Sequence, residues 1–372
     1  MKRIQKSFIS KDLSKKMVFI VGPRQVGKTW LAKEIAKDFS NPFYLNYDHL
    51  EDRKIIHNEN WLPTIDLLIL DEIHKMKNWK NYLKGIYDTR PENLHILVTG
   101  SARLDIFRQS GNSLAGRYFL HHLLPVSYKE SSFSRKFTID HIIERGGFPE
   151  PLLAESPEDA TRWGNQYAES LIRYDVLDFE KIHDIRAIQI LFQLLRSRVG
   201  TPVSYKSISE DIGISPNTVK KYIQILEALY IVFKVTPFAH NIARSLQKEP
   251  KLYFYDTGLV QGDEGVRFEN FVAVSLLKHL CYLHDTKGVI TRLHYLRTKD
   301  GHEVDFCLVE NEQAKLMIEV KHSDSNVSRH LYYFNKRFEI PGVQVVRYLR
   351  KERMNSKIAL RKAENFLMEL SI

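Results

Sequence analysis

Three short apolar runs divide the first third of the chain, and amphipathic stretches lie between them. The runs cover residues 17–21, 66–72 and 94–100, and residues 30–39 after the first run have helical spacing. Runs of this length that are apolar throughout are typical of strands buried on both faces. Residues 15–130 are therefore expected to form an α/β domain with a mostly parallel sheet covered by helices.

Helical spacing dominates the middle of the chain from residue 155 onward. Residues 205–233 have the outline of a helix-turn-helix, with the turn at Gly213, Ser215 as N-cap and Pro216 at the first helical position. Apolar positions 219, 223, 226 and 229 place one face of the second helix in a core. The β-branched run that follows would be the wing of a winged-helix module.

The last third returns to an α/β pattern. A helical stripe at residues 265–280 precedes two strands, residues 294–297 and 303–309, that the polar turn TKDG joins. A third strand follows at residues 315–321. Polar and apolar positions alternate along it, so Glu319 and Lys321 share one side about 6 to 7 Å apart. We expect the neighbouring strand to bring Asp305 beside them.

Length and composition indicate a folded protein of more than one domain. The chain has 372 residues, of which 43% are hydrophobic and 27% charged. We expect a first domain over residues 1–150, a helical connector with a winged-helix-like module over residues 151–240, and a C-terminal α/β domain over residues 241–372.

Charge and cysteine content narrow the partners and the cellular compartment expected for the protein. A formal net charge of +10 attracts polyanions such as nucleic acid or anionic lipid, without choosing between them. Two cysteines, Cys281 and Cys307, are too few for a disulfide framework or a four-cysteine zinc site. The N-terminus has no signal-peptide core, and no run approaches the ~20 apolar residues of a membrane span. We expect a cytoplasmic protein without membrane association.

Residues 22–29 read GPRQVGKT, directly after an apolar strand and directly before a helical pattern. In that context Gly-x4-Gly-Lys-Thr predicts a loop whose backbone N–H groups, with the following helix N-terminus, hold phosphate oxygens. Lys28 would reach the β- and γ-phosphates of ATP, and Thr29 would offer its hydroxyl to Mg²⁺. The expected nucleotide-binding residues are Gly22, Pro23, Arg24, Gln25, Val26, Gly27, Lys28, Thr29 and Trp30. The alternative is a tight strand-to-helix turn without a ligand.

Polar residues end the other two apolar runs. Asp71 would hold magnesium, and Glu72 would polarise the water that attacks the γ-phosphate. Thr99 and Ser101 end the third run, where a polar side chain orients the lytic water or senses the γ-phosphate. On its own, an acidic pair of this kind could be a solvated turn.

Arg117 is the candidate arginine for the transition-state phosphate, in its own subunit or across an oligomer interface. Arg103 competes for that role. Either arginine could instead pair with a surface acid.

The polar side of the last strand indicates a second site. Two carboxylates near one lysine are typical of a magnesium site with an activating cation. Asp305 and Glu319 would bind the metal, the Val320 carbonyl could add a ligand, and Lys321 would position or deprotonate a water. Glu269, from the preceding helix, would complete the set. The alternative is a cluster of structural salt bridges.

Several motifs carry a family resemblance. GPRQVGKT, LDEIHK, TGSAR, LAGRYFLHHLLPVSYKE and RGGFPE resemble a prokaryotic AAA+ ATPase family whose members continue into a C-terminal domain of unknown function, and FEN, GHEVDF and IEVK match that C-terminal domain. The order Glu, Asp, Glu-x-Lys resembles the PD-(D/E)XK nucleases, although no proline precedes Asp305. The resemblance implies an AAA+-like P-loop core, a winged-helix-like middle segment and a nuclease-like C-terminal α/β domain.

Two basic segments are candidate DNA contacts. The exposed face of the second helix would present Asn217, Thr218, Lys220 and Lys221 to a major groove, or would belong to a protein-packing module. Residues 347–362 contain seven basic residues and one acid, which fits either a strip along the DNA backbone or a solvated helix.

The motifs together predict an ATP-dependent DNA-processing protein that uses ATP and Mg²⁺, assembles as a homo-oligomer such as a hexamer, and carries a second, nuclease-like metal site. The rival interpretation is a nucleotide-gated switch or scaffold whose C-terminal domain binds a partner without cutting nucleic acid.

Overall fold

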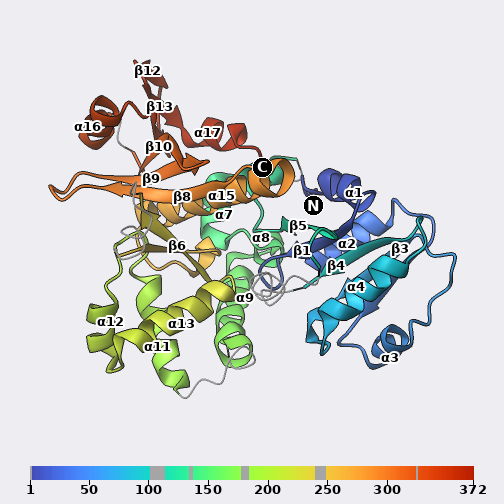
Figure 1. Ribbon diagram of the computed structural model, residues 1–372. Helices are drawn as coiled ribbons and strands as arrows, with labels where there is room; N and C mark the ends of the chain where they lie inside the picture. The colour runs from blue at the N-terminus through green and yellow to red at the C-terminus, as the bar shows by residue number, and fades with distance from the viewer. Residues whose placement is uncertain (1, 101–113, 134–136, 177–183, 239–248, 324–325) are drawn as a thin grey trace. The chain divides into compact units, whose positions relative to one another are not determined.

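The computed structural model describes residues 2–100, 114–133, 137–176, 184–238, 249–323 and 326–372 (Figure 1). The chain divides into two compact units, residues 2–124 and residues 125–372. No helix in the described ranges is long and apolar enough to cross a membrane.

The first unit alternates strands and helices. Its elements are α1 (Lys6–Leu13), β1 (Met17–Val21), α2 (Lys28–Ala36), β2 (Pro42–Asn46), α3 (Leu50–Asn58), β3 (Leu67–Asp71), α4 (Trp79–Thr89), β4 (His95–Thr99) and β5 (Tyr118–His122).

A parallel sheet forms the core of this unit, as the sequence predicts. Its described strands lie in the order β2-β3-β4-β1-β5, and each neighbouring pair is parallel. Every residue of β1 and β3 is buried, because helices cover both faces of the sheet. The register pairs Asp71 with Thr99 and Thr99 with Ile20, so the carboxyl ends of β3, β4 and β1 meet at one edge. Ligands of open α/β sheets bind at that edge.

The second unit begins with helices and ends with a large sheet. Its helices are α6 (Tyr128–Ser132), α7 (Ile139–Arg145), α8 (Pro149–Leu153), α9 (Pro157–Ser170), α11 (Ile185–Arg196), α12 (Tyr205–Ile212), α13 (Pro216–Ala228), α15 (Glu264–Lys287), α16 (Arg329–Phe338) and α17 (Ala363–Glu369). Its strands are β6 (Val232–Pro237), β7 (Lys251–Phe254), β8 (Thr291–Arg297), β9 (Glu303–Glu310), β10 (Gln313–Lys321), β11 (Gly342–Val346), β12 (Arg353–Asn355) and β13 (Ile358–Lys362).

The helix pair α12 and α13 has the caps that its sequence predicts. Gly213 ends α12 in a left-handed conformation with φ +79°, and the Ser215 side chain accepts the Thr218 N–H at 3.1 Å. Pro216 lies in the first turn of α13. The apolar side of α13 is buried, whereas Asn217, Lys220 and Lys221 are exposed.

The large sheet joins two segments of the chain that the sequence placed in separate domains. Its described strands lie in the order β12-β13-β11-β10-β9-β8-β6-β7. β6 pairs with β7 and also with β8, so the sheet runs across the boundary expected at residue 240. Backbone hydrogen bonds between these strands therefore place residues on both sides of position 240 in one sheet, although the sequence pattern changes there.

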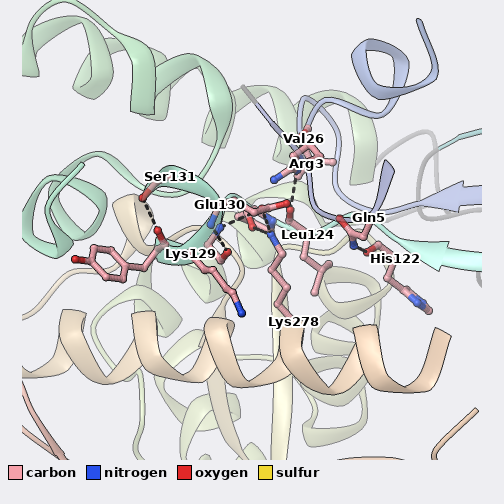
Figure 2. A network of polar contacts seen from close by, with 12 residues as sticks. Arg3, Gln5, Val26, His122, Leu124, Lys129, Glu130, Ser131 and Lys278 are labelled. Carbon is pink, nitrogen blue, oxygen red and sulfur yellow. Dashed lines mark hydrogen bonds and ion pairs between the residues drawn. The ribbon is translucent and has the colours of Figure 1, made fainter. Parts of the chain in front are cut away.

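The other division also differs from the expected one, because residues 125–150 belong to the second unit. There the Val126 N–H donates to the Gly147 carbonyl at 2.7 Å. Lys278 of α15 donates to the Pro125 carbonyl at 2.7 Å and forms a buried ion pair with Glu130 (Figure 2). A buried charge needs such a partner, so this pair fixes residues 125–130 on α15.

Residues 347–362 do not form the solvated helix that was one of the two expectations. Residues 353–355 and 358–362 form the antiparallel strands β12 and β13, and none of the described residues in this range is helical. Arg347 pairs with Asp140 and Glu364, and Arg361 pairs with Glu352 and Glu369. The exposed basic residues are Arg350, Lys351, Arg353 and Lys357.

Candidate functional site

The loop between β1 and α2 makes a turn that glycine alone fits at Gly22. Its φ is +148°, and a Cβ atom there would lie 2.1 Å from the Leu123 carbonyl oxygen. Gly27, with φ +98°, is the N-cap of α2, and Lys28 is the first residue of the helix. The backbone therefore turns closely enough to surround an anion at the N-terminus of α2.

Lys28 is buried inside this loop. Its ammonium donates to the Gly22 carbonyl at 3.0 Å and to the Pro23 carbonyl at 2.6 Å. Arg24, Gln25 and Trp30 are exposed, with Trp30 showing 43% of its surface.

The N-terminal segment braces the same loop, which the sequence did not indicate. The Arg3 guanidinium is buried and donates to the Val26 carbonyl at 3.0 Å and to the Leu124 carbonyl at 2.9 Å (Figure 2). Gln5 donates to the His122 carbonyl at 2.6 Å. The arginine thus joins the P-loop to the end of the β5 segment.

Three hydroxyl groups converge on Asp71. Thr29 and Tyr44 donate to Oδ2 at 2.7 and 2.8 Å, and Thr99 donates to Oδ1 at 2.6 Å. Burial and the Asp71 charge raise the pKa of the Tyr44 phenol well above its usual range, so it remains a donor. The structure brings Thr29, Asp71 and Thr99 together, as the sequence predicts. Tyr44, on the edge strand β2, is an addition that only the sheet order reveals.

Glu72 follows Asp71 in a left-handed conformation with φ +57°, and its N–H donates to the Thr99 carbonyl at 3.0 Å. Burial raises the pKa of its carboxyl, while Lys28 and Lys75 act to lower it. The Lys75 ammonium lies 3.8 Å from Glu72 Oε2. A carboxyl with a raised pKa beside the P-loop lysine has the chemistry of a general base.

The three remaining ATPase candidates, Arg117, Ser101 and Arg103, have different outcomes. The Arg117 guanidinium binds both oxygens of Asp88, on α4, at 2.8 and 3.0 Å. Within one chain, Arg117 thus pairs with a surface acid, which was the alternative to a role at the nucleotide. Ser101 and Arg103 lie outside the described residues.

In the second unit, β9 and β10 assemble the predicted acidic centre. The Val320 N–H donates to Asp305 Oδ2 at 2.9 Å, and Lys321 lies 2.9 Å from Glu319 Oε1. Glu319 is buried, and its Oε2 has no hydrogen-bond partner among the described residues. The Val320 N–H therefore orients the Asp305 carboxylate. The sequence had suggested the Val320 carbonyl as a metal ligand instead.

Residues from before α15 enclose this centre, and no motif in the sequence indicated them. Lys251 of β7 is buried, 2.6 Å from Glu303 Oε1 and 3.9 Å from Asp305 Oδ1. Tyr253 donates to Glu269 Oε1 at 2.7 Å. Lys251 and Tyr253 are two residues apart on β7 and therefore share one side of the strand. A lysine within an otherwise apolar strand was the signal available in the sequence.

Gly200 closes the centre behind Glu269. Its φ is +73°, and a Cβ atom there would lie 2.6 Å from Glu269 Oε1. Its N–H donates to the Leu252 carbonyl at 3.2 Å. The centre is thus built from Gly200, Lys251 and Tyr253 as well as from the C-terminal strands.

Burial, followed by charge repulsion, raises the carboxyl pKa values at this centre. Burial and the neighbouring Asp305 raise the pKa values of Glu269 and of Glu319. Burial acts to lower the pKa of Lys251, but Asp305, Glu269 and Glu303 together raise it, so the ammonium remains charged. Carboxyls with raised pKa values are typical of sites that gain from an added cation.

The donor set at each centre suits Mg²⁺, which prefers oxygen ligands. A hydroxyl and a carboxylate, Thr29 and Asp71, lie together at the P-loop. The unpartnered Glu319 Oε2 and the Asp305 carboxylate offer oxygens in the second unit. Across the described residues, no three His, Cys, Asp or Glu side chains gather closely enough to hold a metal by themselves. Either site would therefore need water or substrate oxygens to complete the coordination.

Comparison with known families identifies the class of the first unit. Residues 14–132 match the model of a family described as an AAA domain. This segment of the chain is therefore similar to AAA domains, in agreement with its parallel sheet and P-loop turn. Residues 136–266 and 264–362 match two further families, each described as a domain of unknown function, DUF8612 and DUF4143.

Two similar proteins are each described as uncharacterized. An uncharacterized protein of Mycobacterium tuberculosis is 24% identical over 245 residues, which are 66% of this chain and 55% of that protein. An uncharacterized protein of Methanocaldococcus jannaschii is 23% identical over 407 residues, covering 98% of this chain and 86% of that protein. The chain spans about half the length of the mycobacterial relatives. A solved Walker-type ATPase of Pyrococcus abyssi is 13% identical, with a TM-score of 0.47 over 69% of this chain and 94% of that one.

Proposed function

We propose that this protein hydrolyses magnesium-bound ATP and couples the hydrolysis to the binding or remodelling of DNA. The observation that carries the ATPase proposal is the convergence of Thr29, Thr99 and Tyr44 on the Asp71 carboxylate, beside a loop that glycine alone fits at Gly22. Such a rigid oxygen cluster at the carboxyl ends of parallel strands is suited to a nucleotide's metal ion.

Each residue of the P-loop centre has a role in this proposal. The loop N–H groups and Lys28 bind the phosphates, and Lys28 leaves the carbonyls of Gly22 and Pro23 to do so. Thr29 and Asp71 would hold Mg²⁺, which neutralises phosphate charge when bound. Glu72 accepts a proton from the attacking water, and burial favours this by raising the pKa of its carboxyl.

ATP hydrolysis by the purified protein tests this proposal. Lys28→Ala should lower the rate by at least about a hundredfold, because the phosphates lose their positive partner. Lys37→Ala is the matched control, since this exposed lysine lies at the other end of α2 and pairs with Glu34 on the surface. Equal rates in the two variants would overturn the ATPase proposal.

For the second unit we propose a metal-dependent centre that hydrolyses phosphodiester bonds. Asp305 and Glu319 would hold Mg²⁺, Glu269 would complete the carboxylate set, and Lys321 would orient the water. The bound metal would supply charge neutralisation and a more acidic water. The observation that supports a cation-binding role is the buried Glu319 Oε2, which has no hydrogen-bond partner among the described residues.

DNA is the proposed partner of this unit. The polar face of α13 exposes Asn217, Lys220 and Lys221, while Thr218 is held in the helix cap by Ser215. Exposed lysines on a helix with a buried apolar side are suited to phosphate contact. A homo-oligomer such as a hexamer would place Arg117 of one subunit at the nucleotide of another, after release from Asp88.

Cleavage of duplex, single-stranded and branched DNA tests the nuclease proposal. Asp305→Asn should abolish Mg²⁺-dependent cleavage and leave ATP hydrolysis within about threefold of wild type, because the substitution keeps the side-chain shape. Asp300→Asn is the control, an exposed carboxylate in the hairpin turn five residues earlier in the chain. Cleavage that persists in Asp305→Asn would contradict a role for this centre.

A second candidate function is a nucleotide-gated switch or scaffold that binds a partner without cleaving DNA. The ion pair of Lys251 with Glu303 favours it, because a lysine already compensates part of the acidic charge. Robust ATP hydrolysis without cleavage of any of the three DNA forms would support this alternative.

A further inference from the structure

Lys251 is enclosed by the acidic centre although it comes from a strand outside the predicted site. Only 2% of its surface is exposed. Its ammonium contacts Glu303 at 2.6 Å and Asp305 at 3.9 Å, and it lies 5.3 Å from the centre of the Tyr295 ring. Each of these neighbours stabilises a positive charge at the same point.

The charges of the centre leave room for one more cation. Four carboxylates, from Glu269, Glu303, Asp305 and Glu319, surround two ammonium groups, from Lys251 and Lys321. Burial raises the pKa values of Glu269 and Glu319, and a bound cation would favour their ionised forms. With all four carboxylates ionised, the excess of two negative charges equals the charge of one divalent cation. Buried like charges are costly without such compensation.

The backbone of Lys251 is fixed, whereas its ammonium sits on a flexible stem. Lys251 pairs with Val235 on β6 and forms a bridge with Pro202 on its other side. Because the Lys251 backbone is paired on both sides, it does not move as a loop would, and only the side chain can move. A cation bound at Asp305 would lie within a few ångströms of this ammonium, where repulsion between charges is strong.

We propose that Lys251 is the internal counter-cation of the acidic centre: it holds Asp305 and Glu303 together without a metal, and it competes with a divalent cation for Asp305. The inference rests on the metal-binding role proposed above for Asp305 and Glu319. It assigns to β7, outside the C-terminal strands, the residue that sets the affinity for metal.

Direct binding of Mn²⁺ to the full chain, without nucleotide, tests this inference. Free Mn²⁺ is measured by electron paramagnetic resonance for the wild type and for Lys251→Met, Lys251→Gln, Lys299→Met and Asp305→Asn. Binding that Asp305→Asn removes belongs to this centre. Lys299→Met controls for the loss of one positive charge, because this lysine is exposed in the hairpin turn.

The expected result is Asp305-dependent binding at least about tenfold tighter in Lys251→Met and Lys251→Gln than in the wild type and Lys299→Met. Binding in the Lys251 variants alone would also support the inference, and would mean that Lys251 keeps the metal out of the native centre. Asp305-dependent binding that is unchanged or weaker in the Lys251 variants would overturn the inference and leave the proposed metal centre standing.

Absence of Asp305-dependent binding in every variant would overturn the metal centre itself. Thermal unfolding covers the case in which loss of Lys251 destabilises the protein. Because the metal should replace the missing charge, saturating Mn²⁺ is expected to restore the melting temperature of Lys251→Gln. A variant that stays unfolded at saturating Mn²⁺ would overturn the inference as well.

Discussion

At the scale of single residues, the same side-chain type has a different role according to what lies around it. Asp71 accepts three hydroxyl hydrogen bonds at a sheet edge, whereas Asp88 binds a surface arginine with both oxygens. Asp256 is buried in the second unit and accepts the Gly258 N–H at 3.1 Å. Burial and partners, and not the residue type, decide which carboxylate remains available for a metal or a proton.

Arg117 and Asp88 allow the role of the arginine to be separated from the role of the ion pair. If Arg117 reaches the nucleotide of a neighbouring subunit, Arg117→Ala should lower ATP hydrolysis by at least about a hundredfold. Asp88→Ala should leave the rate within about threefold, because exposed ion pairs contribute little to stability. Melting temperatures of both variants serve as the control, and equal loss of rate in both would assign Arg117 to the fold alone.

Asp256 predicts a pH dependence of stability in the second unit. Burial raises the pKa of its carboxyl to about 7. At pH values between the ordinary aspartate pKa and about 7, the folded state therefore holds a proton that the unfolded state has lost. Its contribution to stability is present below the ordinary aspartate pKa and is lost as pH rises through about 7. Replacement by asparagine keeps the acceptor for Gly258 but removes the titrating group.

Asp256→Asn should therefore gain stability relative to wild type as pH rises from about 5 to about 8, by a few kcal/mol at most, since one pKa unit corresponds to about 1.4 kcal/mol. Urea unfolding at each pH measures the difference. The exposed helix cap Asp263→Asn is the control, because its side chain accepts one backbone N–H, from Val266, in a solvated position. A difference between Asp256→Asn and wild type that does not change with pH would contradict the prediction.

At the scale of elements, tight backbone approaches build both centres. Gly22 faces the Leu123 carbonyl, and Gly200 faces the Glu269 carboxylate, each at a distance that a Cβ atom would violate. Both glycines have φ values in the region that favours glycine. The two sites thus depend on turns as much as on the side chains that do the chemistry.

Two glycines of the first unit give opposite predictions. Gly22→Ala should abolish nucleotide binding and lower the melting temperature, because its Cβ would lie 2.1 Å from the Leu123 carbonyl oxygen at an unfavourable φ. Gly85→Ala, within α4 and with open space around it, should be neutral or stabilising by about 0.5 to 1 kcal/mol. Thermal unfolding with and without a nucleotide analogue measures both, and an unaffected Gly22→Ala would refute this account of the loop.

At the scale of the whole molecule, the positive net charge is distributed unevenly between structural and exposed groups. Arg347 and Arg361 are held by two acids each, whereas Arg350 and Lys351 are exposed near the β12–β13 hairpin. Exposed arginine and lysine side chains bind DNA phosphates and release counterions. The hairpin is therefore a candidate for the strip that the sequence suggested over residues 347–362.

Salt dependence of DNA binding measures this contribution. Arg350→Gln with Lys351→Gln should weaken binding to all sequences alike and reduce the slope of log affinity against log salt by about 1 for each phosphate that is no longer neutralised. Lys315→Gln with Lys336→Gln removes the same charge from exposed positions on β10 and α16. Equal effects in the two double variants would mean that only net charge acts.

The local features could be predicted from the amino-acid sequence alone. The P-loop turn, the caps Ser215 and Pro216, and the pairing of Glu319 with Lys321 on one side of a strand follow from spacing along a few residues. Local conformational preferences and strand alternation act over such short ranges, so the sequence is enough to read them.

The meeting of segments that are distant in the sequence became known from the fold. Tyr44 reaches Asp71 because β2 pairs with β3, and Lys251 reaches Asp305 because β6 joins β7 to the C-terminal strands. Strand order and domain division depend on backbone pairing and burial summed over many residues. No local pattern carries that information, so the residues that complete each centre became visible only in the fold.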